Sequence, residues 1–339
     1  MNQSSVNLLD LPNEILFNIL KKLENTDVLY SLFDINNEQL DNIVQEETFS
    51  NTLNFALTVH NTTIIDSVLD RFCNYILPQI HYNVKCLIVA PASIKRFLIA
   101  THYPSLTELK LLDFQCNSSL RYFTDDSPFR HIFKQQITKL DLINEDWKRA
   151  IESLIDYTKR VYGPILICFE NLEHLNDIQT SIRAYPDLGV RYLSSSAFSS
   201  LTLTYLCINM GTLTDCLCLL DGRLKQLTIF IVRIYYMDIN SSINQNMDDL
   251  PHLKCFSLIH YGLIKEYDNN IVRLLRRMFT ENNSNDLVHY LSDNDVKRNY
   301  RNIGHQEVLD MFGFGSVQHR FSDSGASSVR FRFTVRDRP

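Results

Sequence analysis

The first fifty residues carry apolar side chains at the spacing of short amphipathic helices. Past Pro12, apolar residues recur at positions i, i+1, i+4, i+5 and i+8. They give one helix a wide apolar side, made of Ile15, Leu16, Ile19, Leu20 and Leu23. Pro12 suits the first turn of this helix, because its missing N–H is not needed there. A second short helix follows, with Thr26 as its predicted cap, and a third spans about 37–44. Three helices this short cannot bury their apolar surface alone, so the first one packs into the core of the chain or onto a partner.

Beyond residue 80 the pattern changes to a repeated motif of the form L-x-x-L-x-L, in which L stands for any apolar residue. Six instances begin at Val84, Leu106, Ile137, Leu203, Leu224 and Leu253. Most follow one another at about 20–30 residues, which is typical of leucine-rich repeats, each with one short strand and a return segment. The longest interval is about twice that, and the apolar run 165–169 is a candidate for an irregular unit within it.

Helical patterns lie between these predicted strands, at 148–157, 212–220 and 270–279. A series of strands and helices with short connections predicts parallel strands, which can stack into a curved solenoid. An ordinary α/β domain is the alternative, because the spacing is irregular and no asparagine ladder accompanies it.

Alternate positions of each strand in such an array point away from the core and form a face that can meet a partner. By alternation this face holds a mixed, partly aromatic set, as interaction surfaces often do. Its candidate target-binding residues are Glu108, Lys110, Tyr205, Asn209, Gln226 and Phe230, with Lys139, Asp141 and Ser257 as further members. A solvated strand face tolerates the same residues, so the pattern identifies no ligand.

Residues 280–339 depart from the repeat pattern. Residues 282–295 are polar and predict a loop, and residues 312–328 are rich in turn formers and predict a linker. Apolar and polar residues then alternate over 329–335, which predicts a half-buried strand. This strand either pairs with the open edge of the array or stays unpaired, and we expect low order in the whole segment.

Composition narrows the class of protein. The 339 residues are 45% hydrophobic and 21% charged, enough for a core and for two units, or one domain with a repeat array. A formal charge of −6 argues against nucleic acid as a partner and gives no support to binding at a membrane surface. No secretory signal or apolar run of membrane-spanning length is visible, and the eight scattered cysteines predict a reduced cytoplasmic or nuclear protein.

Candidate chemistry is sparse. The nine glycines form no phosphate-binding motif, and no nucleophile elbow, HExxH or kinase motif is present. His252, Cys255 and His260, and the nearby Cys216 and Cys218, lack the spacing of a zinc site. We therefore predict a protein without catalytic residues, metal or cofactor.

Residues 8–44, LLDLPNEILFNILKKLENTDVLYSLFDINNEQLDNIV, resemble an F-box. The Leu-Pro-x-Glu-[Ile/Leu]-Leu signature of that family is present at 11–16, and an apolar first helix and a short second helix follow it. The second half departs from the family, because 40–44 reads Leu-Asp-Asn-Ile-Val where a Val-Cys-[Arg/Lys]-x-Trp type of stretch is usual.

The resemblance implies that this module docks into a groove on a small Skp-type adaptor, and through it on a cullin. It implies that the adaptor contacts are Leu11, Pro12, Ile15, Leu16, Ile19, Leu20 and Leu23. An F-box followed by leucine-rich repeats is a familiar architecture, so each feature supports the other.

The expected fold is α/β, with a short three-helix F-box before an irregular leucine-rich-repeat solenoid of parallel strands. The expected parts are an F-box at 6–50, a helical linker at 51–80, repeats at 81–279 and the polar loop and C-terminal strand at 280–339. The expected function is a non-catalytic substrate-recognition subunit of a cullin-based ubiquitin ligase, whose repeats bind an unknown protein. The alternatives are a repeat scaffold that binds no adaptor, and an enzyme of unrecognised type.

Overall fold

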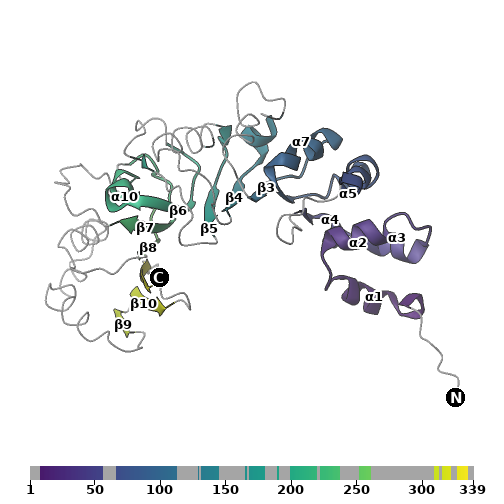
Figure 1. Ribbon diagram of the computed structural model, residues 1–339, viewed down its shortest axis with the longest axis horizontal. Helices are drawn as coiled ribbons and strands as arrows, with labels where there is room; N and C mark the ends of the chain where they lie inside the picture. The colour runs from purple at the N-terminus through teal and green to yellow at the C-terminus, as the bar shows by residue number, and fades with distance from the viewer. Residues whose placement is uncertain are drawn as a thin grey trace, which may run out of the picture. The chain divides into compact units, whose positions relative to one another are not determined.

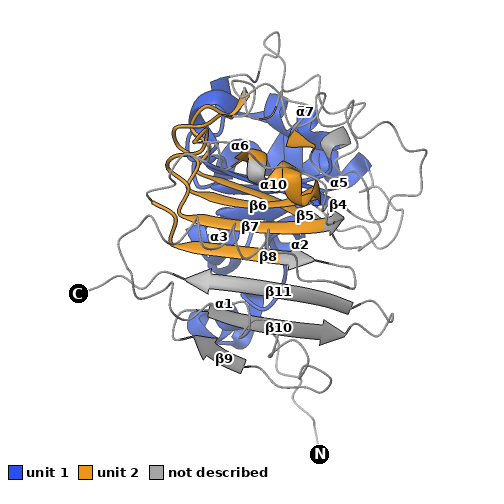
Figure 2. Cartoon of the chain, turned by 90° about the vertical axis from the view of Figure 1, so that its left-hand side faces the viewer, with its two compact units in different colours: residues 1–143 blue, residues 144–339 orange. Residues whose placement is uncertain are grey.

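The structure is a computed structural model in which helices alternate with parallel strands (Figure 1). It describes residues 8–55, 66–112, 129, 131–144, 165, 168–179, 189–190, 199–219, 222–236, 252–260, 309–312, 315–321 and 327–334. The chain divides into two compact units, residues 1–143 and 144–339 (Figure 2). The described part of each unit holds four parallel strands, and the combination of helices and parallel strands confirms the predicted α/β class.

Short helices open the first unit. They are η1 (Leu8–Asp10), α1 (Asn13–Leu20), α2 (Asn25–Leu32), α3 (Glu38–Val44) and α4 (Glu47–Ser50). Asn37 caps α3, because its side chain accepts a hydrogen bond from the backbone N–H of Leu40 at 3.1 Å. The three helices that the sequence predicts are present. Thr26 lies inside α2 and is not its cap, which corrects that prediction.

The sheet of the first unit holds the strands β1 (Thr52–Asn54), β2 (Cys86–Val89), β3 (Glu108–Leu112) and β4 (Lys139–Asn144). They pair in parallel in chain order, and the register aligns the buried Leu53, Leu87, Leu109 and Leu140. The helical segments between the strands are α5 (Asp66–Arg71), η2 (Phe72–Ile76), α6 (Leu77–Ile80), α7 (Pro91–Ala100) and η4 (Ile132–Gln136). The predicted linker at 51–80 thus contains a strand of the sheet and the helices that follow it.

The second unit has the parallel strands β5 (His174–Gln179), β6 (Tyr205–Thr212), β7 (Ile229–Tyr236) and β8 (Cys255–His260). They lie side by side in that order (Figure 2). Helix α10 (Leu213–Leu219) follows β6 where the sequence predicts a helix. The other two helices predicted between the strands, at 148–157 and 270–279, lie outside the described residues.

Three antiparallel strands continue the sheet of the second unit beyond β8. They are β9 (Leu309–Phe312), β10 (Gly315–Phe321) and β11 (Ser327–Thr334). β11 pairs with β8 and with β10, and β10 pairs with β9. A strand therefore forms where the alternation predicts one, and it pairs with the edge of the array. The predicted linker over 312–328 is wrong in part, because it contains β10.

Two strands that the repeat pattern misses have polar residues at pattern positions. β1 follows Ser50-x-x-Leu53-x-Phe55, and β5 follows Leu172-x-x-Leu175-x-Asp177. The missing unit in the long interval is therefore β5 and not the apolar run 165–169. The instance placed at Leu224 is shifted by three residues, because Leu227-x-x-Phe230-x-Val232 is the set that aligns with β6.

Candidate functional site

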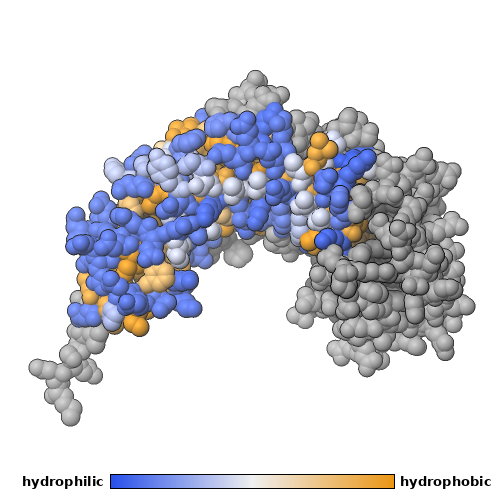
Figure 3. Space-filling view, turned by 180° about the vertical axis from the view of Figure 1, so that it is seen from behind, coloured by the Kyte–Doolittle hydropathy of each residue, from blue (hydrophilic) through white to orange (hydrophobic). Residues whose placement is uncertain are grey.

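Helix α1 is apolar on two sides, and among the described residues one side is buried while the other is exposed. Leu16 and Leu20 are 0% and 3% exposed, whereas Ile15, Ile19 and Leu23 are 48%, 42% and 54% exposed. Ile15 and Ile19 lie four residues apart and therefore share one side of the helix, and Leu23 lies in the turn that follows it. With the exposed Pro12 they form what we name the α1 stripe: Pro12, Ile15, Ile19 and Leu23. Figure 3 shows apolar surface among hydrophilic side chains over these N-terminal helices.

The inner side of α1 is fixed by the other helices of the module. Gln39 of α3 donates from its side-chain amide to the Leu11 carbonyl at 3.2 Å and to Asn13 Oδ1 at 2.8 Å. Phe17 meets Phe49 edge to face, with ring centroids 5.5 Å apart. These contacts hold α1 over α3 and α4. The α1 stripe is thus presented on a helix whose orientation is set by its opposite side.

The sequence predicts seven adaptor contacts, and the structure places them in two groups. Pro12, Ile15, Ile19 and Leu23 are exposed, and Leu11 is half-buried. Leu16 and Leu20 belong to the core of the module, so their side chains are not available to a partner. The apolar pattern could not separate the groups, because both recur with helical periodicity.

The second half of the F-box-like segment contributes three residues to the core of the module and one exposed apolar residue. Leu40, Ile43 and Val44, where the family has a different stretch, are all buried. In the turn before α3, Asp34 and Asn36 adopt positive φ angles of 61° and 58°. Aspartate and asparagine tolerate this left-handed conformation better than most residues. The exposed Ile35 lies between them, and helical periodicity gave no signal for it because it lies outside a helix.

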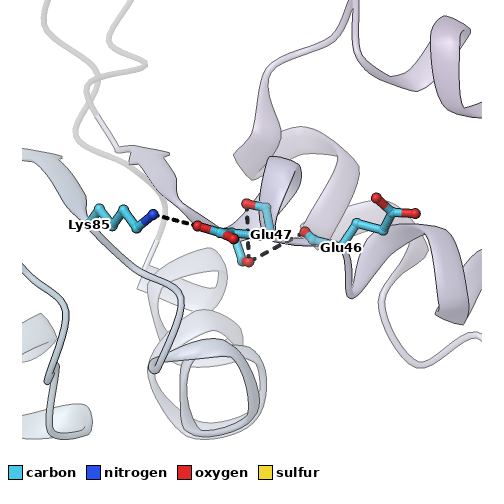
Figure 4. A network of polar contacts seen from close by, with 4 residues as sticks. Glu46, Glu47 and Lys85 are labelled. Carbon is cyan, nitrogen blue, oxygen red and sulfur yellow. Dashed lines mark hydrogen bonds and ion pairs between the residues drawn. The ribbon is translucent and has the colours of Figure 1, made fainter.

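The helical module continues directly into the sheet. The backbone N–H groups of Lys85 and Cys86 both donate to the Asn51 carbonyl, at 2.8 and 2.9 Å. The Lys85 ammonium also pairs with Glu47 of α4 at 2.5 Å (Figure 4). Both side chains are more than half exposed, so this ion pair adds little stability, and the backbone bonds make the connection.

The outward face of the first unit carries a charge ladder across two strands. Lys110 Nζ lies 3.0 Å from Glu108 Oε1 and 3.2 Å from Asp141 Oδ2. Burial lowers the pKa of Lys110, but the hydrogen bonds and charges of the two carboxylates outweigh burial and raise the pKa overall. Beside them, burial and the charge of Glu108 raise the pKa of the Cys86 thiol to about 12. Glu108 and Lys110 therefore lie together on a half-buried face, as the alternation predicts.

The four candidate residues of the second unit do not form one surface. Tyr205 is half-buried and stacks on His174, with centroids 3.9 Å apart and planes at 8°. Asn209 is buried and donates from Nδ2 to both the backbone carbonyl and Oδ2 of Asp177, each at 3.2 Å. Gln226 is exposed but lies in the turn before β7.

Phe230 is fully buried, so its predicted outward orientation is wrong. The three-residue shift in the predicted repeat reversed the two faces of β7, because a displacement by an odd number of residues exchanges the sides of a strand. In register, Phe230 aligns with the buried Leu206, and Ile229 aligns with Tyr205. The outward-facing residue at this level of β7 is therefore Ile229.

The described residues bring together no group of three or more side chains that could hold a metal ion. Burial raises the pKa of the thiols of Cys207 and Cys216, which keeps them protonated and poorly nucleophilic. None of the described helices has the length and hydrophobicity that a membrane-spanning segment needs.

Comparison with known proteins assigns this chain to no family. None of the protein-family models, curated proteins or solved structures compared with this chain matches it. The F-box resemblance therefore rests on the residues of the N-terminal module themselves.

Proposed function

We propose that this chain is a non-catalytic substrate-recognition subunit of a cullin-based ubiquitin ligase. Its N-terminal helices act as an F-box that docks on a Skp-type adaptor, and its strand array binds the protein to be modified. The α1 stripe is the observation that carries the proposal. Leu16 and Leu20 already anchor this segment in the module, so the exposed Ile15, Ile19 and Leu23 are not needed for its folding. They offer apolar surface that a partner can bury.

The size of the stripe limits what it can do alone. Fully burying one such side chain stabilises by roughly 1.5–3 kcal/mol, so three half-exposed ones contribute on the order of 2–5 kcal/mol. A micromolar complex needs about 8 kcal/mol net of the cost of association. The proposed interface therefore extends to other exposed apolar side chains of the module, for which Leu9 and Ile35 are candidates.

We infer that the parallel strands belong to an irregular leucine-rich-repeat solenoid. The support is the recurring pattern, its alignment in register at Leu53, Leu87, Leu109 and Leu140, and the helical segments between successive strands. Of the candidate target-binding residues, Glu108, Lys110 and Tyr205 remain half-exposed on strand faces. The bound protein is unknown.

Co-expression with a Skp-type adaptor tests the docking step. The native chain is expected to co-elute with the adaptor, and the Ile15→Asp/Ile19→Asp variant is expected to elute alone, because a buried unpaired carboxylate is costly. The matched control is Asn18→Asp/Lys21→Gln, which changes the net charge equally at exposed positions of the same segment. Equal co-elution of all three chains, or of none, contradicts the proposal.

One observation favours the second candidate, a repeat scaffold that binds no adaptor. Leu16 and Leu20 face inward, and Leu40, Ile43 and Val44 serve the core of the module. A native chain that is monodisperse alone and binds no Skp-type adaptor would support this function.

A further inference from the structure

Strand β1 is the first strand in the order of the sheet, and no described strand pairs with its outer edge. Among the described strands it pairs only with β2. The backbone N–H of Cys86 donates to the Asn51 carbonyl at 2.9 Å, and the backbone N–H of Phe55 donates to the Ile88 carbonyl at 2.8 Å. The odd-numbered residues of the β1 segment therefore bond toward β2. Backbone groups of a strand alternate in direction, so the carbonyls of Thr52 and Asn54 point to the outer edge. Such an edge is open to unwanted pairing unless something covers it.

Two neighbouring side chains of α2 occupy this edge. Asn25 Nδ2 donates to the Thr52 carbonyl at 2.9 Å, and also to the Thr48 carbonyl at 3.1 Å. Thr26 Oγ1 donates to the Asn54 carbonyl at 3.1 Å, and Thr26 is buried. The two donors reach alternate carbonyls of the strand, as the N–H groups of a neighbouring strand would.

The far end of α2 is joined to the helices that follow β1. Arg71 Nη2 donates to the Phe33 carbonyl at 3.1 Å, and its guanidinium lies 5.1 Å from the centroid of the Tyr30 ring. Tyr30 stacks on Phe72 at 6.2 Å, and Phe72 meets Phe55 edge to face at 4.8 Å. Contacts at both ends of α2 therefore fix its orientation relative to β1.

From these contacts we propose that the N-terminal helices are the N-terminal cap of the parallel array, and that Asn25 and Thr26 are its positioning residues. Terminal units of a repeat array need such a cover for the last open surface. The same bonds fix the α1 stripe relative to the outward face of β3 and β4. That second consequence has functional meaning only if the proposed function holds, whereas the capping does not depend on it.

The test compares two substitutions at Thr26, one that removes its hydroxyl and one that keeps it. Thr26→Val keeps the shape of the side chain but removes the donor, and Thr26→Ser keeps the donor. Asn25→Ala/Thr26→Val removes both donors. Spin labels on non-natural side chains at the exposed positions 22 and 139 report the distance between the helical module and β4 in the full-length chain. Amide hydrogen exchange reports protection of the Phe55 and Cys86 N–H groups in the same proteins.

The native chain and Thr26→Ser are expected to give one narrow distance distribution. Thr26→Val is expected to broaden it, and the double variant to broaden it further, with exchange at Phe55 faster by about tenfold. A distribution as narrow as the native one in both Val variants overturns the proposal. If the double variant does not fold, the Thr26→Val and Thr26→Ser pair decides by the same distance.

These outcomes are separable from the docking experiment. A narrow native distribution that Thr26→Val broadens supports the cap even if the native chain binds no adaptor. Adaptor binding by a chain whose distance distribution is already broad, and unchanged by Thr26→Val, overturns the cap while leaving the proposed function in place.

Discussion

The two apolar sides of helix α1 differ in what they touch. Leu16 and Leu20 pack into the N-terminal helices, while Ile15, Ile19 and Leu23 meet solvent. Residue type does not separate them, because leucine occurs on both sides. The comparison teaches that a broad apolar stripe on a short helix can hold an anchor and a docking surface at once. Substitutions on each side should therefore change different quantities.

The largest effect is expected on the inner side. Leu16→Ala or Leu20→Ala should lower the free energy of unfolding of the helical module by roughly 2–5 kcal/mol, because each leaves a cavity in a packed core. Ile15→Ala, on the outer side, should change it by less than about 0.5 kcal/mol. Urea unfolding followed by circular dichroism measures both. Similar decreases in the free energy of unfolding for Leu16→Ala and Ile15→Ala would contradict the distinction between the two sides.

The next effect concerns the bond that orients the helix. Gln39→Ala removes the donor shared by the Leu11 carbonyl and Asn13 Oδ1, and should cost about 0.5–1.5 kcal/mol of unfolding free energy. Gln39→Glu keeps the length but replaces the donor with an acceptor, and should cost at least as much. A loss for Gln39→Ala that is absent for Gln39→Glu would show that the amide donor is not what matters.

The smallest effect on stability is expected for Ile19→Ala. Ile19 is 42% exposed, so truncation removes only part of a buried contact, and alanine has the higher helix propensity. The two effects oppose each other, so the free energy of unfolding should change by less than about 0.5 kcal/mol. Adaptor binding should nevertheless weaken, by about tenfold for roughly 1.4 kcal/mol of missing burial. Isothermal titration alongside urea unfolding separates the two quantities, and weaker folding with unchanged affinity would place Ile19 on the inner side.

Much of the fold follows from the sequence, and the strands that were missed can be traced to particular residues. The three helices, the strands at Leu87, Leu109 and Leu140, and the C-terminal strand follow directly from apolar periodicity. Strands β1 and β5 are missed because Ser50 and Asp177 are buried polar residues at positions where the pattern demands an apolar one. Burial of a polar side chain depends on partners that are distant in the sequence, which periodicity cannot supply.

The sequence predicts which residues of α1 are apolar, but not which of them are exposed. The stripe on α1 could be found, but its division into inner and outer sides depends on how α1 packs on α3 and α4. Asn25 and Thr26 read as ordinary residues of a helix start, since asparagine and threonine are common caps. Their bonds to Thr52 and Asn54 span more than twenty residues and have no sequence signature.

The central claim is that the exposed side of α1 binds an adaptor while the buried side holds the fold. One paired measurement tests it most directly: titration of a Skp-type adaptor into the native chain and into Ile15→Asp/Ile19→Asp, with urea unfolding of both. The account predicts that the native chain binds, that the variant shows no heat of binding, and that their unfolding free energies agree within about 1 kcal/mol. A variant that binds as tightly as the native chain, or a stable native chain that does not bind, would contradict it.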